Sequence, residues 1–207
     1  MILSSSSASL PNFTIDLTAA SRCSATAGHR ERSTKDARSQ VATRVSVPKR
    51  SFLLLSGVPA VGKSSFGRYL AREHAFAHYD LECYPRGWPH PELKPVWDSS
   101  RASFVAQLKG LHDRVVLDWG FPVNAVPWVR ELLAAGVRLV WFAADTGKAR
   151  ELFLQRGGIA VANFDAQVRG IEQASLPNSL QCVRVGALRN TGKLSDPSEI
   201  LRAIFRE

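Results

Sequence analysis

The stretch SFLLLSGVPAVGKSS, residues 51–65, decides the fold of this chain. It opens with an apolar run of the length that a buried strand needs. Gly57 and Gly62 then bound a segment of small side chains, and the pattern from Ser64 to Glu73 favours a helix. A buried strand that passes through a glycine-rich loop directly into a helix predicts a parallel α/β sheet.

The loop in this stretch matches the P-loop pattern, with Gly57, four residues, Gly62, Lys63 and Ser64 in the required spacing. Glycines let the backbone curl so that its N–H groups point at phosphate oxygens, and the new helix adds free N–H groups of its own. Lys63 would reach the β- and γ-phosphates, and Ser64 would ligate Mg²⁺. The pattern predicts a bound nucleoside triphosphate, with contacts at Gly57, Ala60, Val61, Gly62, Lys63, Ser64 and Ser65.

Strands and helices are expected to alternate along the rest of the chain. The expected strands are 51–57, 76–80, 115–120, 137–144 and 180–185. The expected helices are 64–73, 98–112, 127–135, 146–156, 164–174 and 196–205, the last with Asp196 as its N-cap and Pro197 in its first turn. Segment 83–95 holds four prolines and no regular pattern. The fold class predicted is an α/β three-layer αβα sandwich around a five-stranded parallel sheet.

The first 47 residues differ in composition from the remainder. They contain the run SSSSAS, scattered arginines and no sustained periodicity, which indicates a disordered, Ser/Arg-rich extension ahead of a domain at 48–207. A transit peptide and a misassigned start are the alternatives. Residues 1–50 carry eight Lys or Arg against three Asp or Glu, so much of the +9 net charge lies there. The domain itself is only mildly basic, as a phosphate-ester binder would be, and lacks the charge of a dedicated nucleic-acid protein.

The composition also indicates the number of domains and the compartment to expect. Its 207 residues suffice for one domain with a core, and no run approaches the length of a membrane span. Cys23, Cys83 and Cys182 are far apart and odd in number, which favours a reducing compartment. We therefore expect a cytoplasmic monomer or weak dimer that does not associate with membranes, with organelle targeting through the extension as the alternative.

Two acidic residues stand where parallel strands are expected to end. Asp118 closes the run VVLD and is placed to hold Mg²⁺, as a Walker B aspartate does, with an ordinary strand-end residue as the alternative. Asp80 closes FAHYD and could accept a proton from an acceptor hydroxyl, with a turn or cap role as the alternative. Glu82 is a weaker candidate for that task. Ligands gather at this edge of an open parallel sheet, which places both aspartates beside the glycine-rich loop.

On GVPAVGKSS, FAHYD, VVLDWGF and ARELFLQRGG, residues 52–205 resemble the small P-loop kinases. That group includes nucleoside monophosphate and shikimate kinases, polynucleotide 5′-hydroxyl kinases, zeta toxins and related kinase-like or AAA-type ATP-binding proteins. The resemblance implies a sheet in the order 2-3-1-4-5, ATP over the loop, and Asp80 facing the acceptor. It also implies lid arginines at Arg150 and Arg156, and a loop beside the adenine that carries Arg189 and Asn190.

The chain departs from those kinases in two places, and it also lacks a motif of the GTPases. GFPV, residues 120–123, lacks the arginine that clamps a monophosphate acceptor, so a nucleoside monophosphate is disfavoured. Leu152 stands four residues before Arg156, where nucleotide kinases carry a second arginine, which weakens the assignment of Arg150. No N-K-x-D motif is present, so ATP is favoured over GTP.

The segment 82–97 is expected to lie over the acceptor. Its aromatic side chains could stack on a base or a sugar ring, or could simply pin a proline-rich loop to the surface. The residues in question are Tyr84, Arg86, Trp88, His90 and Trp97. His74, His78 and His112 show no metal-binding or triad spacing and are interpreted as structural.

These observations predict a Mg²⁺-dependent kinase that moves the γ-phosphate of ATP to a hydroxyl of a small acceptor. The catalytic residues would be Lys63, Asp80, Arg156 and Arg150, with Ser64 and Asp118 at the metal. Two alternatives stay open. One is a nucleotide-dependent regulatory ATPase without a small acceptor, and the other is a polynucleotide 5′-hydroxyl kinase, whose partner would be a nucleic-acid end.

Overall fold

The computed structural model of the chain describes residues 45–82, 91–157, 161–189 and 191–206. Of the features expected above, the extension up to residue 44, Cys23, Cys83, Tyr84, Arg86, Trp88, His90 and Asn190 lie outside these ranges. The described residues fall in one compact unit, Thr43–Glu207. Within them, no helix combines the length and the apolar character that crossing a bilayer would need.

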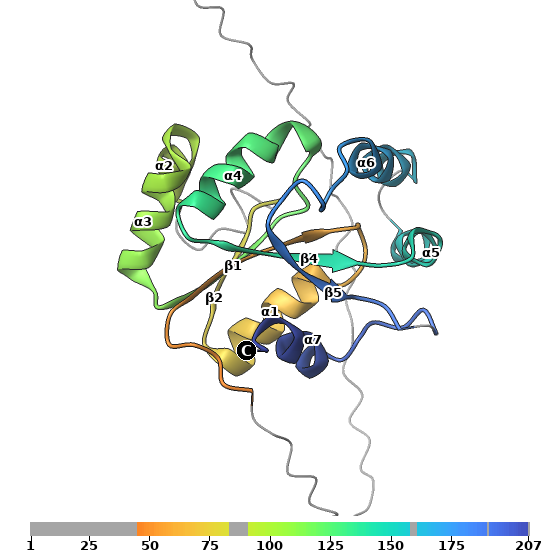
Figure 1. Ribbon diagram of the computed structural model, residues 1–207, viewed down its shortest axis with the longest axis horizontal. Helices are drawn as coiled ribbons and strands as arrows, with labels where there is room; N and C mark the ends of the chain where they lie inside the picture. Colours follow the sequence, from red (N-terminus) through yellow and green to blue (C-terminus); the bar gives the residue numbers. More distant parts are fainter. Residues whose placement is uncertain (1–44, 83–90, 158–160, 190, 207) are drawn as a thin grey trace, which may run out of the picture. The chain divides into compact units, whose positions relative to one another are not determined.

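Five parallel strands form the central sheet, in the order β2-β3-β1-β4-β5 (Figure 1). Their bounds are β1 Ser51–Gly57, β2 Ala77–Asp80, β3 Arg114–Asp118, β4 Arg138–Ala143 and β5 Cys182–Gly186. Both the expected number of strands and the order implied by the resemblance are confirmed. Because β1 is central and buried along its whole length, it reads as a continuous apolar run rather than an alternating one.

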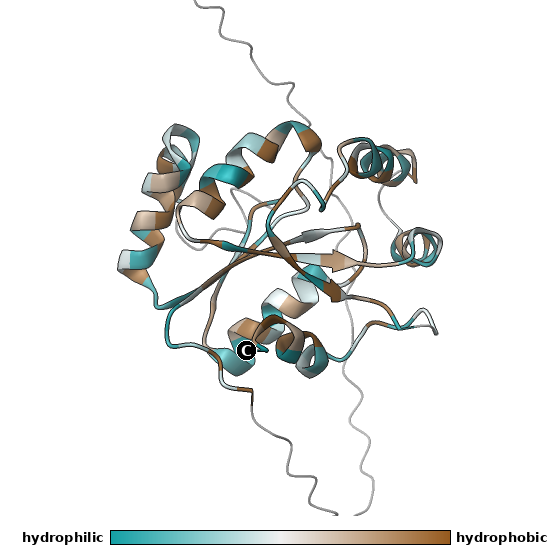
Figure 2. Ribbon diagram, viewed as in Figure 1, coloured by the Kyte–Doolittle hydropathy of each residue, from teal (hydrophilic) through white to brown (hydrophobic). Residues whose placement is uncertain are grey.

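Side chains of β1 alternate between the two faces of the sheet. Phe52 and Leu54 point into one hydrophobic cluster, and Leu53 and Leu55 point into the other. Helices α2 (Leu93–Ser99), α3 (Arg101–Leu111) and α4 (Val126–Ala134) contribute to the first cluster, and α1 (Lys63–His74) and α7 (Pro197–Ile204) to the second. Figure 1 shows the two groups above and below the sheet, and Figure 2 shows apolar strands between helices of mixed polarity. The αβα sandwich is confirmed.

Two further helices lie beyond the carboxyl end of β4 (Figure 1). Helix α5 spans Thr146–Arg156 and α6 spans Val161–Gln173, and they lie beside each other at the right of Figure 1. Helix α5 matches its expected bounds, whereas α6 begins three residues earlier than expected. Asp196 caps α7 as predicted, since its Oδ1 accepts a hydrogen bond from the backbone N–H of Ser198 at 2.8 Å.

The region between β2 and β3 differs from expectation. The sequence predicts irregular chain up to Pro95 and one helix near 98–112, but two helices meet there with a break at Ser100. Pro95 is tolerated because it stands in the first turn of α2, where its missing N–H needs no partner. Ser100 is extended and its hydroxyl accepts the N–H of Ser103 at 3.2 Å, so it starts a new helix.

Trp97 is a core residue. The interpretation in which its ring stacks on a base or a sugar of the ligand is therefore wrong. Its ring lies 5.1 Å from Phe104 and 5.4 Å from Trp119, and the side chain is 8% exposed. The guanidinium of Arg101 lies 5.3 Å from the Trp97 ring centroid and 5.0 Å from that of Trp128. A cation held between two indole faces fixes this corner of the core.

Leu54 offers a direct test of the first cluster, because it is fully buried in the central strand. We expect Leu54→Ala to lower the free energy of unfolding by about 2–5 kcal/mol, through lost burial and the cavity that remains. Leu111→Ala removes the same atoms from a side chain that is 49% exposed and should cost about 0.5 kcal/mol or less. Urea denaturation measures both, and equal losses would contradict the burial described.

Candidate active site

The glycine-rich loop links β1 to α1 at the carboxyl edge of the sheet. Its curl requires positive φ angles at Gly57, Ala60 and Gly62, of 126°, 64° and 87°. A Cβ on Gly57 would lie 2.3 Å from the backbone oxygen of Phe142 on β4, so no side chain fits there. Glycine is therefore required at position 57 both by the loop conformation and by the close approach of a neighbouring strand.

Helix α1 begins in the loop without a side-chain cap. Gly62 is its N-cap and has no side chain that could accept a hydrogen bond from the first turn. The leading N–H groups of the helix therefore face the loop with the positive end of the helix dipole. This arrangement binds anions, and phosphate oxygens in particular.

Lys63 is buried at the head of α1, with 8% of its surface exposed. Its Nζ donates a hydrogen bond to the backbone oxygen of Val58 at 3.0 Å, across the loop. Burial lowers the pKa of Lys63, the charges of Glu82 and Asp118 oppose this, and the charge of Arg156 adds to it. Three charged groups from separate parts of the sequence thus act on Lys63.

A cavity of about 440 Å³ opens at this loop. It brings together predicted site residues from three elements: Lys63 and Ser64 on α1, Asp80 at the end of β2, and Arg156 at the end of α5. Several lining residues had no role predicted from the sequence. They are Pro59, Arg68, Phe153, Asn163, Phe164, Gln167 and Leu194.

Asp118 lies at the end of β3, in register with Asp80 on β2 and Leu55 on β1. It is 2% exposed, and its Oδ2 lies 3.7 Å from Nε2 of His78. Neither of these atoms has a hydrogen-bond partner among the described residues. Helix α1 packs against His78 at Gly67, where a Cβ would come within 2.6 Å of Nε2. The sequence analysis did not predict the contact between His78 and Asp118, although His78 stands two residues before Asp80 and thus on the same face of the strand.

The oxygen donors at the loop fit a magnesium ion. Mg²⁺ takes oxygen ligands and binds proteins through one or two side chains, keeping waters and substrate phosphates as its other ligands. The Ser64 hydroxyl, which lines the cavity, and the buried carboxylate of Asp118, which is not among the lining residues, are such groups. Among the residues in the described ranges, no three His, Cys, Asp or Glu side chains gather closely enough to hold a metal alone.

Glu82 joins the ends of β2 and β3. Its Oε1 accepts the backbone N–H of Gly120 at 2.7 Å, and the oxygen of Gly120 accepts a hydrogen bond from Nε2 of Gln167 at 3.0 Å. A Cβ on Gly120 would lie 2.6 Å from the same Glu82 oxygen. Gly120 is thereby held between a carboxylate and a carboxamide that both line the cavity.

The two predicted lid arginines lie in different environments. Arg156, the last residue of α5, lines the cavity. Arg150 instead makes two hydrogen bonds with the Asp165 carboxylate on α6, at 2.9 and 3.3 Å, and is not among the lining residues. Hydrogen bonding to Arg150 lowers the pKa of Asp165, as expected for an ion pair. The structure therefore brings Arg156 to the loop and leaves Arg150 at the contact between α5 and α6.

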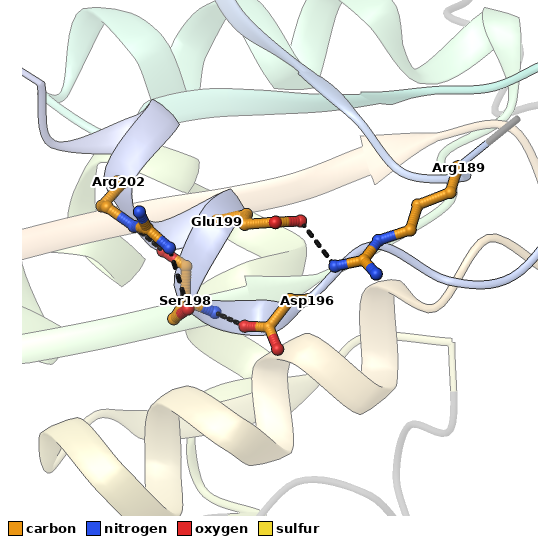
Figure 3. A network of polar contacts seen from close by, with 5 residues as sticks. All are labelled: Arg189, Asp196, Ser198, Glu199 and Arg202. Carbon is orange, nitrogen blue, oxygen red and sulfur yellow. Dashed lines mark hydrogen bonds and ion pairs between the residues drawn. The ribbon is translucent and has the colours of Figure 1, made fainter. Parts of the chain in front are cut away.

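A second cavity of about 350 Å³ continues from the loop toward α7. Gly62, Ser65 and Leu194 line both cavities, and the second one adds the predicted residues Val61 and Arg189. Its remaining walls are mostly apolar and consist of Phe66, Ala187, Ser195, Asp196, Pro197 and Ile200. Figure 3 shows Arg189 reaching the Glu199 carboxylate, at 3.0 Å, across the start of α7. This cavity thus combines mostly apolar walls with a guanidinium at one side.

Comparisons with known proteins bear on the fold. No family model matches the chain, and no curated protein matches it. The structure of a sugar kinase from Janibacter sp. matches with a TM-score of 0.51 at 14% identity, over 74% of this chain and 91% of that one. A shikimate kinase from Acinetobacter baumannii matches with a TM-score of 0.49 at 14% identity, over 75% and 93%. The chain has the fold of the P-loop kinases.

The bond between Glu82 and Gly120 can be tested without any ligand. Gly120→Ala should displace the Glu82 carboxylate and lower the free energy of unfolding by about 1–2 kcal/mol. After Glu82→Ala, the same glycine substitution should cost about 1 kcal/mol less, because the bond is already lost. Chemical denaturation of the four proteins in this double-mutant cycle measures the coupling.

Gly110→Ala provides the control for that cycle. A Cβ at Gly110 would meet no atom within 4 Å, and the residue lies within α3. Alanine there should leave stability unchanged or raise it by up to about 1 kcal/mol. Strict additivity of the Gly120 and Glu82 changes would show that the hydrogen bond is not formed.

Proposed function

We propose that the chain is an ATP-dependent kinase that transfers the γ-phosphoryl group to a hydroxyl of a small acceptor. The observation that carries the proposal is a single cavity that the loop and Lys63 line together with Asp80, at the end of β2, and Glu82, two residues beyond it. A site that only bound a nucleotide would need the loop but not two further carboxylates in the same cavity. The likeness in fold to P-loop kinases supports the proposal and does not by itself establish an activity.

The loop and α1 would hold the nucleotide. Lys63 would exchange its bond to the Val58 oxygen for phosphate oxygens, which compensates the cost of burying its charge. Backbone N–H groups of residues 60–65 would contact the β-phosphate, and the second cavity beside Arg189 would take the adenine. Ser64 and Asp118 would hold Mg²⁺, which neutralises phosphate charge when it is bound.

Asp80 would act on the acceptor. Its carboxylate lies at the cavity and its Oδ1 accepts the N–H of Glu82 at 3.0 Å, which fixes its orientation. The acceptor oxygen attacks the γ-phosphorus, the bond from that phosphorus to the β–γ bridging oxygen breaks, ADP leaves, and the hydroxyl proton passes to Asp80. Arg156 would stabilise charge on the moving phosphoryl group. Arg150 would act as a positioning residue that holds α5 against α6 through Asp165.

The experiment that tests the proposal supplies the full chain with γ-labelled ATP, Mg²⁺ and pooled acceptors. The pools are nucleosides, sugars, amino alcohols, antibiotics and 5′-hydroxyl oligonucleotides, and Lys63→Ala serves as the blank. Label in any small-molecule pool supports the proposal. Label in the oligonucleotides alone would favour a polynucleotide kinase, and label released only as free phosphate would favour a regulatory ATPase.

Asp80→Asn separates chemistry from nucleotide binding. Because the amide cannot take the proton, transfer to the acceptor should fall by about 10²–10⁴-fold. ATP affinity, measured by displacement of a fluorescent analogue, should stay within about two-fold, whereas Lys63→Ala should weaken it strongly. Full transfer activity in Asp80→Asn would indicate that Glu82, the other carboxylate that lines the cavity, accepts the proton.

Asp118→Asn tests the metal site. Removing the charge of the buried carboxylate should raise the Mg²⁺ concentration needed for half-maximal activity about ten-fold, while ATP binding measured without Mg²⁺ stays unchanged. Asp113→Asn is the matched control, because Asp113 is exposed and pairs with Arg50 on the surface. An unchanged Mg²⁺ requirement in Asp118→Asn would contradict the assignment.

A further inference from the structure

We propose that Gln167 is a positioning residue, which anchors α6 to the backbone of Gly120 and thereby fixes the place of Arg156 at the transferred phosphoryl group. The inference rests on the proposed function, because it takes the role of Arg156 from there. It follows from a series of contacts that runs from the chain just beyond β3, through α6, to the last residue of α5.

Gly120, two residues beyond β3, gives Gln167 a fixed point to bind. Its backbone N–H donates to Oε1 of Glu82 at 2.7 Å, and its backbone oxygen accepts a hydrogen bond from Nε2 of Gln167 at 3.0 Å. A Cβ at this position would lie 2.6 Å from the Glu82 oxygen and 3.3 Å from Nε2 of Gln167, so both side chains crowd the same side of the glycine. The chain beyond β2, the chain beyond β3 and α6 therefore meet at one residue.

Helix α6 lies against the same stretch of chain one turn further on. Gly170 follows Gln167 by three residues, which puts both on one face of the helix. A Cβ on Gly170 would lie 3.1 Å from Cγ2 of Val123, so the α6 backbone approaches that side chain closely. An apolar contact has no preferred direction, whereas a hydrogen bond does. The bond from Gln167 is therefore the contact that defines where α6 lies along residues 120–123.

The same face of α6 leads to Arg156. Phe164 stands three residues before Gln167 and is 2% exposed, and its ring lies 5.2 Å from that of Phe153 on α5. Phe153 in turn stands three residues before Arg156, so these two share a face of α5. All four residues line the 440 Å³ cavity. A displacement of α6 at Gln167 would therefore move Phe164, and with it the end of α5 that bears Arg156.

A second contact makes α5 and α6 move together. The Arg150 guanidinium on α5 donates to both oxygens of the Asp165 carboxylate on α6, at 2.9 and 3.3 Å. The two helices lie beside each other in Figure 1. Arg156 is itself exposed, so its place depends on the helix that carries it. Stabilisation of a transferring group depends steeply on distance, so loosening α6 should slow transfer without changing how the loop holds the nucleotide.

A double-mutant cycle with Arg156 tests the inference on the full chain. Gln167→Met keeps the length of the side chain and removes the donor. It should lower kcat about ten-fold and leave the KM for ATP within about two-fold, because Arg156 acts on the moving phosphoryl group. In an Arg156→Ala background, the same substitution should lower kcat no further. An unchanged kcat in Gln167→Met, or losses that multiply in the double variant, would overturn the inference.

Two further variants separate positioning from a general loss of structure. Gln173→Met makes the same change at an exposed residue of α6 that is not among those lining the two cavities, and it should leave kcat unchanged. Gln167→Asn keeps a carboxamide but is one methylene shorter, so it should behave as Gln167→Met does. Thermal unfolding confirms that each variant is folded. Full kcat in Gln167→Asn would show that the hydrogen bond to Gly120 is not what the site needs.

Binding of a transition-state mimic tests the same contact without an acceptor. Aluminium fluoride with ADP and Mg²⁺ stands for the planar phosphoryl group, so it should raise the ADP affinity of the unmodified chain at least about ten-fold. Gln167→Met and Arg156→Ala should each remove most of that gain and leave the affinity for ADP alone unchanged. A gain that persists in Gln167→Met would overturn the inference and leave the proposed function standing.

The remaining outcomes separate the inference from the proposed function. If label leaves ATP only as free phosphate, the kinase function fails, and the same cycle measured on the rate of that release still decides the inference. If the unmodified chain shows neither transfer, nor release, nor a gain from aluminium fluoride, both are overturned.

Discussion

The site depends on the way in which β1 ends. The strand is buried along its whole length and pairs with β3 and β4, and its last residue pairs with Phe142 on β4. At Gly57 the space left by the Phe142 backbone excludes even a methyl group, and the φ of 126° is one that other residues rarely adopt. A strand that must end in this way forces the chain to turn sharply over the edge of the sheet. The loop, the uncapped start of α1 and the position of Lys63 all follow from that turn.

Charge is distributed around this turn in a way that favours a ligand. Lys63 is buried with one carbonyl partner, and Asp118 is buried with one carboxylate oxygen unpartnered among the described residues. Both groups carry a desolvation cost that the folded chain alone offsets only in part. A triphosphate and its metal would supply a partner to each at once. The free energy of folding that these two buried charges cost would therefore be recovered as binding free energy when a ligand supplies their partners.

The sequence predicted those parts of the molecule in which local pattern and tertiary structure agree. The five strands, the helix after the loop and the capped helix α7 belong to this group, because apolar runs, glycines and Asp196 act over a few residues. It failed where contacts join distant segments. The burial of Trp97 depends on Trp119 and Trp128, the contact of Arg150 depends on Asp165, and the contact of His78 depends on a glycine in α1. Glu82 was ranked below Asp80 since nothing in the local sequence shows that Gly120 and Gln167 would fix it.

The indole cluster has a consequence for how the molecule can be observed. Trp119 follows the candidate metal ligand Asp118 and precedes Gly120, which Glu82 holds, and its ring stacks on Trp128 at a 6.4 Å centroid distance. Trp97 meets both rings edge-on, at interplanar angles near 80°. Indoles packed this closely share their electronic transitions, so their near-ultraviolet circular dichroism and emission depend on the angles between them. Any shift of the β3 end when a ligand arrives would alter those angles, which gives the protein an intrinsic optical signal at its own site without an attached dye.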